Sequence, residues 1–166
     1  PSLLGGIVLL PPLSDSPVSI PVPDQLWCAV VHPHMEIKTE DSRTILPNEI
    51  SMDTTVAAMG QLGGLKSGLY ESDYDRISQS LFDPLVTPYR SQLIPGFQKA
   101  MKSIRECGAL GGGISGSGPS VFVLGKGKDV IQRAVERMNE VFLEEGMASE
   151  SYVSPIASRG AYVLPQ

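Results

Sequence analysis

The chain has 166 residues, enough for one domain with a hydrophobic core, and 42% of its residues are hydrophobic. Its formal net charge is −5, which argues against a nucleic-acid groove or a polybasic membrane-binding segment, because both need clustered Lys and Arg. No run approaches the ~20 apolar residues that span a bilayer. The two cysteines, Cys28 and Cys107, are too few for a disulfide scaffold, so both are predicted to be reduced thiols.

Three short strands are predicted near the start of the chain. Leu3 to Leu10 is an apolar run that Pro11 interrupts, and Val18 to Val22 alternates apolar with small or polar residues. Leu26 to Val31 is a continuous apolar run of the kind found in fully buried strands, and Pro33 follows it. We therefore expect a β-rich segment here.

Helices are predicted through the middle of the chain. Thr39 is placed to N-cap a short helix that continues to Leu46, and Ser51 or Asp53 is placed to cap a longer one. The longer helix has apolar residues at helical spacing, which are Val56, Met59, Leu62, Leu65 and Leu69. Each glycine weakens a helix by up to ~1 kcal/mol relative to Ala, so close packing against another backbone is expected at Gly63, Gly64 and Gly68.

The second half of the chain predicts an α+β fold. Helices are expected at Asp73 to Phe82, Ser91 to Cys107 and Lys128 to Glu145. Strands are expected at Ala109 to Ile114, Val121 to Leu124, Glu150 to Ser154 and Gly160 to Leu164. The order of helix, strand, loop, strand, helix and strand suits a ferredoxin-like α/β sandwich, in which helices cover one face of an antiparallel sheet.

A glycine- and serine-rich loop between two predicted strands carries the clearest functional signal. The stretch from Gly108 to Leu124 reads G-A-L-G-G-G-I-S-G-S-G-P-S-V-F-V-L. Glycines let backbone N–H groups approach an anion, and Ser115, Ser117 and Ser120 add hydroxyl donors. The loop matches neither G-x-x-x-x-G-K-S/T nor the dinucleotide fingerprint G-x-G-x-x-G before a helix. On this chemistry alone, a phosphate-facing loop and a tight structural turn both stay open.

The same stretch resembles the third conserved motif of the GHMP kinase superfamily, and in particular that of the homoserine kinases, G-A-x-G-x-x-I-S-G-S-G-P-S/T. Thr39 to Pro47 resembles their T-x-x-x-R-x-x-L-P, and Thr87 to Phe97 resembles their E-P-x-R-x-x-L-I-P-G-F. Pro1 to Leu9 resembles the segment after their D-N-x-A sequence. The resemblance covers nearly the whole chain, in matching order and spacing. It implies the GHMP kinase C-terminal domain fold.

The resemblance also implies an activity, ATP-dependent phosphorylation of the L-homoserine hydroxyl in threonine biosynthesis, by a cytoplasmic enzyme that forms homodimers. Arg43 and Arg90 match arginines of the family's motifs, so the resemblance makes them the substrate-site candidates. The planar guanidinium of an arginine suits a carboxylate. A surface ion pair is the alternative role for each of them. The loop would line the active site through Gly113, Ser115, Gly116, Ser117, Gly118 and Ser120.

Several features of the family are absent from this chain. Its ATP-binding loop, P-x-S-S-G-L-G-S-S, its magnesium-binding acidic residue and its D-N pair all precede the matching segment. We therefore expect a fragment, with residues 1–32 continuing a missing N-terminal kinase domain and residues 33–166 forming the C-terminal domain. ATP and Mg²⁺ would be bound mainly by the missing half, so no catalytic residue or metal ligand is assigned and the fragment is expected to be inactive alone. Thr87 also stands where the family has Glu, which removes a negative charge near Arg90.

Other interpretations stay open. Another GHMP-type kinase, such as a mevalonate-like one, fits the loop but not the contexts of Arg43 and Arg90. A stand-alone ferredoxin-like domain that binds an amino acid would not need the I-S-G-S-G-P loop. A structural half that dimerises is compatible with the apolar strands. His32 and His34 lack further ligands at metal-binding spacing and are expected to be ordinary loop histidines.

Overall fold

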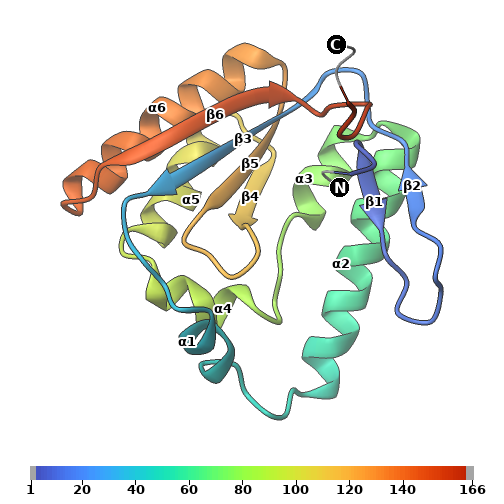
Figure 1. Ribbon diagram of the computed structural model, residues 1–166, viewed down its shortest axis with the longest axis horizontal. Helices are drawn as coiled ribbons and strands as arrows, with labels where there is room; N and C mark the ends of the chain where they lie inside the picture. Colours follow the sequence, from blue (N-terminus) through green and yellow to red (C-terminus); the bar gives the residue numbers. More distant parts are fainter. Residues whose placement is uncertain (1–2, 164–166) are drawn as a thin grey trace.

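A computed structural model describes residues 3–163, which contain a four-stranded antiparallel sheet with two helices on one face (Figure 1). The strands are ordered β4 (Gly111–Ile114), β5 (Val121–Lys126), β3 (Leu26–Pro33) and β6 (Ser149–Pro155). The helices are α5 (Phe97–Glu106) and α6 (Lys128–Glu144). In chain order the elements run β3, α5, β4, β5, α6, β6, which is the ferredoxin-like β-α-β-β-α-β arrangement. The predicted α+β sandwich is confirmed.

The main core lies between this sheet and the two helices. Alternate residues of the strands point toward the helices, so Ala29, Val31, Val121 and Val123 are fully buried. The helix predicted over Lys128 to Glu145 is present as α6, and its residues Ile131, Ala134, Met138, Val141 and Phe142 are also fully buried. These residues fix the sheet and therefore both ends of the loop between β4 and β5.

A second, smaller group of elements lies beside the sheet (Figure 1). It holds β1 (Ile7–Leu9), which pairs with β2 (Val18–Ile20), and the helices α2 (Met52–Glu71) and α3 (Tyr74–Ser80). Leu26, Leu69, Ile77 and Leu110 form its buried core. The remaining elements of residues 3–163 are the short helices α1 (Thr39–Thr44) and α4 (Thr87–Arg90) and the 3-10 turn η1 (Ser91–Leu93).

Several predicted boundaries differ from the structure, including the following three. The predicted helix from Ser91 to Cys107 is interrupted, because Pro95 disfavours the helical conformation before it and Gly96 adopts a φ of +76°. Thr39 does not cap α1, since Lys38 occupies the N-cap position and Thr39 is the first helical residue. Residues 160–163 of the predicted last strand form no strand, and Leu164 lies outside the described residues.

Strand β3 crosses the division at residue 32 that the sequence predicts. Its residues pair with β5 on one side and with β6 on the other, so residues 26–33 all lie in the four-stranded sheet.

Cys28 and Cys107 are free thiols. Burial raises the pKa of the Cys28 thiol, which favours the unreactive protonated form. No helix within residues 3–163 is both long and apolar enough to cross a membrane.

Helix α2 begins as the sequence predicts but is buried only in part. Ser51 caps it, accepting a hydrogen bond from the Thr54 N–H at 3.1 Å. The predicted close packing against another backbone is present at Gly68, where a Cβ would lie 3.0 Å from the Ile77 nitrogen, whereas at Gly64 a Cβ would collide with the side chain of Ser80. It is absent at Gly63, which has no atom within 4 Å of such a Cβ among the described residues.

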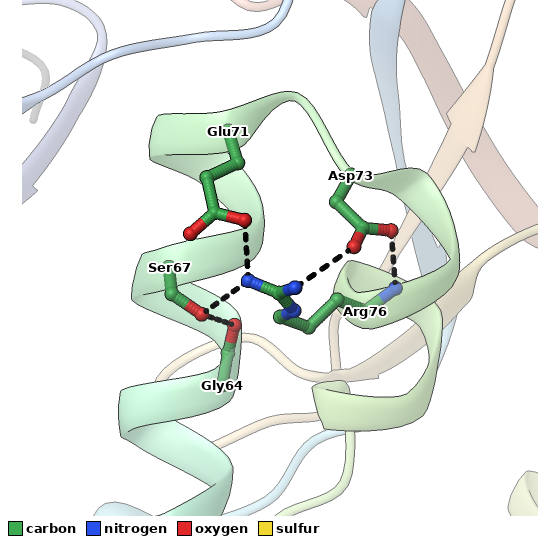
Figure 2. Close-up of polar contacts among 5 residues, drawn as sticks. All are labelled: Gly64, Ser67, Glu71, Asp73 and Arg76. Carbon is green, nitrogen blue, oxygen red and sulfur yellow. Dashed lines mark hydrogen bonds and ion pairs between the residues drawn. The ribbon is translucent and has the colours of Figure 1, made fainter.

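The corner between α2 and α3 is held by Arg76 (Figure 2). Its Nη1 donates to Glu71 Oε2 at 2.6 Å and to Ser67 Oγ at 3.2 Å. Its Nη2 lies 3.3 Å from Asp73 Oδ2, while Asp73 Oδ1 accepts from the Arg76 backbone N–H at 3.0 Å. Ser72 turns the chain between the helices in the left-handed conformation, with a φ of +55°. One guanidinium thus connects both helices across the turn.

Replacing Arg76 with Ala is expected to lower the free energy of unfolding by about 1 kcal/mol, because a partly exposed network of several charges contributes more than one surface pair. Urea denaturation of the chain measures this change. The matched control is Arg137→Ala, which removes an exposed pair with Glu140 on α6 and is expected to cost less than Arg76→Ala. Equal losses in the two variants would contradict a special role for Arg76.

Candidate functional site

The glycine- and serine-rich loop forms a tight turn between β4 and β5. The Ser115 N–H donates to the Ser120 carbonyl at 2.8 Å, and the Gly118 N–H donates to the Ser115 carbonyl at 3.1 Å. Gly116 adopts a φ of +64°, which glycine tolerates and most residues do not. Ser115 and Gly116 are exposed. The tip of the turn is therefore open to a ligand while its base is closed by backbone bonds.

Arg90 fixes this turn to a distant part of the chain. Its Nε donates to the Ser42 carbonyl of α1 at 2.9 Å, and its Nη1 donates to the Gly116 carbonyl at 2.9 Å. The guanidinium at the end of α4 thus joins α1 to the loop. Its Nη2 makes no hydrogen bond to any of residues 3–163, so one edge of the fork is available to a ligand.

Two further residues hold the loop. The fully buried Ser42 donates its hydroxyl to the Ser117 carbonyl at 3.0 Å. His32, in β3, places its Nδ1 2.9 Å from Ser120 Oγ. The loop is therefore fastened at Gly116, Ser117 and Ser120. Neither contact was predicted, because a serine within a short polar helix and a histidine before Pro33 carry no periodic or motif signal of their own.

Arg43 differs from Arg90 in having no fixed partner. It follows Ser42 on α1 and is exposed. Its side chain makes no hydrogen bond or ion pair within the described part of the chain, although Glu40 and Asp41 are close in sequence. A surface ion pair, the alternative role considered for Arg43, is thus not observed there. Since Arg90 holds α1 by the carbonyl of the preceding residue, the position of Arg43 depends on Arg90.

The three glycines before the loop serve the sheet. A Cβ on Gly112 would overlap the carbonyl oxygen of Phe122 in β5, and one on Gly113 would lie 3.0 Å from the Phe122 ring. Gly111 has a φ of +152° and packs against Leu81. Gly113, which the sequence places with the active-site loop, therefore lies in β4 rather than in the turn. At Gly112 the two strands approach so closely that only glycine fits.

An apolar groove of about 790 Å³ runs between α2, α5 and β4. Its lining includes Leu62, Leu65, Leu81, Met101, Ile114 and Phe122. Thr87, at the position of the family's Glu, also lines it, and its hydroxyl donates to Asp83 Oδ2 at 3.2 Å. Asp83 further accepts the backbone N–H groups of Leu85, Val86 and Thr87. A carboxylate thus lies beside Thr87, where it organises the start of α4.

The residues around the loop supply positive and neutral hydrogen-bond donors. Within residues 3–163, no group of three or more His, Cys, Asp or Glu side chains is arranged to hold a metal ion. The loop offers backbone N–H groups and serine hydroxyls, and Arg43 and the Nη2 edge of Arg90 offer cationic donors. Such a set suits a carboxylate or phosphate.

The sequence profile for "GHMP kinases C terminal" matches residues 65–143. Residues 65–143 therefore match the C-terminal domain of the GHMP kinases. Homoserine kinase from Chlorobium phaeobacteroides (strain DSM 266) is 43% identical over 99% of this chain and 52% of the relative. Homoserine kinase from Chlorobaculum tepidum is 37% identical over the same shares. The chain thus spans about half the length of the curated relatives it matches.

A solved structure supports the same placement. The crystal structure of homoserine kinase from Cytophaga hutchinsonii ATCC 33406 matches with a TM-score of 0.92 at 40% identity, over 96% of this chain and 51% of that one. Phosphomevalonate kinase from Streptococcus pneumoniae matches with a TM-score of 0.65 at 12% identity, which concerns the fold alone. The predicted GHMP kinase C-terminal domain fold is confirmed.

Proposed function

We propose that this chain is the C-terminal part of a homoserine kinase, which transfers the γ-phosphoryl group of ATP to the side-chain hydroxyl of L-homoserine. The observation that carries the proposal is similarity to homoserine kinases over 99% of the chain. A second observation supports the proposal, because Arg90 donates hydrogen bonds both to α1 and to the loop. This contact brings together three of the four segments that resemble the family's motifs.

In this proposal each group has a separate task. Arg43 and the free Nη2 edge of Arg90 bind the carboxylate of homoserine, and the N–H and hydroxyl groups of the loop face the phosphates. Phosphoryl transfer depends mainly on positioning and on neutralising charge, and ATP with Mg²⁺ supplies the phosphoryl group when bound. The residues described here fit the anionic groups, and in this proposal Mg²⁺ is bound mainly by the other half of the enzyme.

The proposal includes a domain division. Because β3 is an inner strand of the four-stranded sheet, we place the start of the C-terminal domain at β3 rather than after residue 32. The β1–β2 hairpin is assigned to the preceding domain, since a two-stranded hairpin is only marginally stable by itself. The whole enzyme is proposed to be cytoplasmic.

An ADP-release assay tests the activity. A full-length enzyme containing this sequence is expected to show Mg²⁺-dependent turnover with L-homoserine, at a kcat/KM roughly 100-fold or more above that for mevalonate, because a site built for polar groups rejects substrates that leave them unpaired. The 166-residue chain alone is expected to show no turnover. Preference for mevalonate would refute the proposed substrate. Turnover by the chain alone that equals that of the full-length enzyme would refute its proposed inactivity.

A further inference from the structure

The two histidines near the end of β3 have different surroundings. His32 is half-buried within the strand, and its Nδ1 lies 2.9 Å from the hydroxyl oxygen of Ser120. His34 follows the strand and is exposed, and its Nε2 lies 3.6 Å from Glu150 Oε1. Of the two rings, only that of His32 is hydrogen-bonded to the glycine- and serine-rich loop.

Strand pairing places His32 beside Ser120. The antiparallel neighbours β3 and β5 pair up to Val31 and Val121, which are buried against the helices (Figure 1). The next residues along the two chains are His32 and Ser120. Because side chains alternate along a strand, the His32 ring points to the face of the sheet away from α5 and α6. The sheet therefore fixes the position from which His32 contacts the loop.

The Ser120 hydroxyl can be used in two ways. A serine hydroxyl has one hydrogen to donate and lone pairs that accept. If Nδ1 accepts, that hydrogen points at the imidazole and only lone pairs are left for a ligand. If Nδ1 carries the proton and donates, the hydroxyl hydrogen is left for a ligand. Within residues 3–163 neither the Ser120 hydroxyl nor His32 Nε2 has another hydrogen-bond partner, so no residue there requires the proton to lie on Nε2.

We infer that His32 is a positioning residue for phosphoryl transfer. Its Nδ1–H donates to Ser120 Oγ, and the Ser120 hydroxyl hydrogen is thereby directed at a phosphate oxygen of ATP. The inference rests on the proposed function, in which the loop faces the phosphates. An anion accepts hydrogen bonds and does not donate them, so it is bound by this arrangement and not by the reverse one.

Two features of Ser120 favour this role. Its carbonyl accepts the Ser115 N–H at 2.8 Å, so the main chain and the side chain of Ser120 are both held before a ligand binds. A donor that is already oriented stabilises developing charge without reorganisation. In addition, a hydroxyl whose oxygen accepts a hydrogen bond becomes a stronger donor, because bonds in a chain polarise one another.

The protonation of the His32 ring tests the proposed donor without reference to activity. In the full-length enzyme labelled with ¹⁵N-histidine, nuclear magnetic resonance is expected to show the neutral His32 ring with its proton on Nδ1. The spectrum of His32→Asn assigns the signals. A neutral ring that carries its proton on Nε2 would overturn the inference, even if the enzyme phosphorylates homoserine.

A pair of substitutions tests the effect on the reaction. Relative to Cβ, the amide nitrogen of Asn lies where Nδ1 does, and that of Gln lies where Nε2 does. His32→Asn is expected to keep kcat/KM for ATP within about threefold, and His32→Gln to lower it about tenfold, the effect of one hydrogen bond. KM for homoserine should stay unchanged in both. The matched control, His34→Gln, should change neither constant. Equal values for the two His32 variants, or a loss confined to KM for homoserine, would overturn the inference.

A double-mutant cycle tests whether His32 acts through Ser120. Ser120→Ala is expected to lower kcat/KM for ATP about tenfold, and adding His32→Gln should cause no further loss, because the two side chains form one unit. An additive loss of roughly 100-fold in the double variant would contradict the positioning role. Turnover of the unsubstituted full-length enzyme with L-homoserine reports separately on the proposed function.

Discussion

Replacing Arg90 with Ala is expected to lower kcat/KM of the full-length enzyme about 100-fold or more. The guanidinium makes two charge-assisted hydrogen bonds to backbone carbonyls, of Ser42 and of Gly116. Such bonds contribute ~1.5–3 kcal/mol each, and 1.36 kcal/mol corresponds to about tenfold in rate. Losing them releases both α1, which carries Arg43, and the tip of the loop.

Two further variants separate positioning from substrate binding. Arg90→Lys is expected to recover little activity, because one ammonium cannot reproduce the planar fork that reaches two carbonyls. Arg43→Ala is expected to act mainly on KM for homoserine, since Arg43 has no fixed partner within the described residues. Hydrogen exchange adds a structural readout: Arg90→Ala should speed exchange in α1 and the loop, and Arg43→Ala should not. Unchanged exchange in Arg90→Ala would contradict the positioning role.

Replacing Gly112 with Ala is expected to destabilise the chain by about 3 kcal/mol, near the upper end for an overpacked site. The Cβ would overlap the carbonyl oxygen of Phe122, which is backbone in the neighbouring strand and cannot move aside without disturbing the β4–β5 pairing. Urea denaturation measures the loss. The expected effect arises in the sheet and not in the loop tip.

Gly116→Ala is the matched control for this effect. Gly116 has a φ of +64°, and no described atom lies within 4 Å of its added Cβ, so only the left-handed conformation is penalised. We expect a cost of about 1 kcal/mol at this position. If the two glycine variants lose equal stability, the close approach between β4 and Phe122 is not the reason that glycine occupies position 112.

Local sequence signals predicted much of the fold. The helix predicted over Lys128 to Glu145 is present as α6, and Ser51 marked the start of α2. The signals failed where two of them conflicted. The apolar spacing from Ser91 to Cys107 favours one helix, yet Pro95 and Gly96 divide it. Likewise, Val56 and Met59 have helical spacing and remain exposed, because periodicity shows that a face is apolar and not what covers it.

For the glycine- and serine-rich loop, the sequence by itself determined its place between two strands, its donor chemistry and its resemblance to a GHMP kinase motif. Only the tertiary structure decided what holds it. Ser42 lies 75 residues from Ser117, and His32 lies 88 residues from Ser120, so no local pattern encodes either contact. The tertiary structure also separated the glycines of β4, which allow close strand packing, from those of the turn. The physical reason is that strand and helix formation depend on neighbours along the chain, whereas the fastening of a loop depends on where distant backbone carbonyls come to lie.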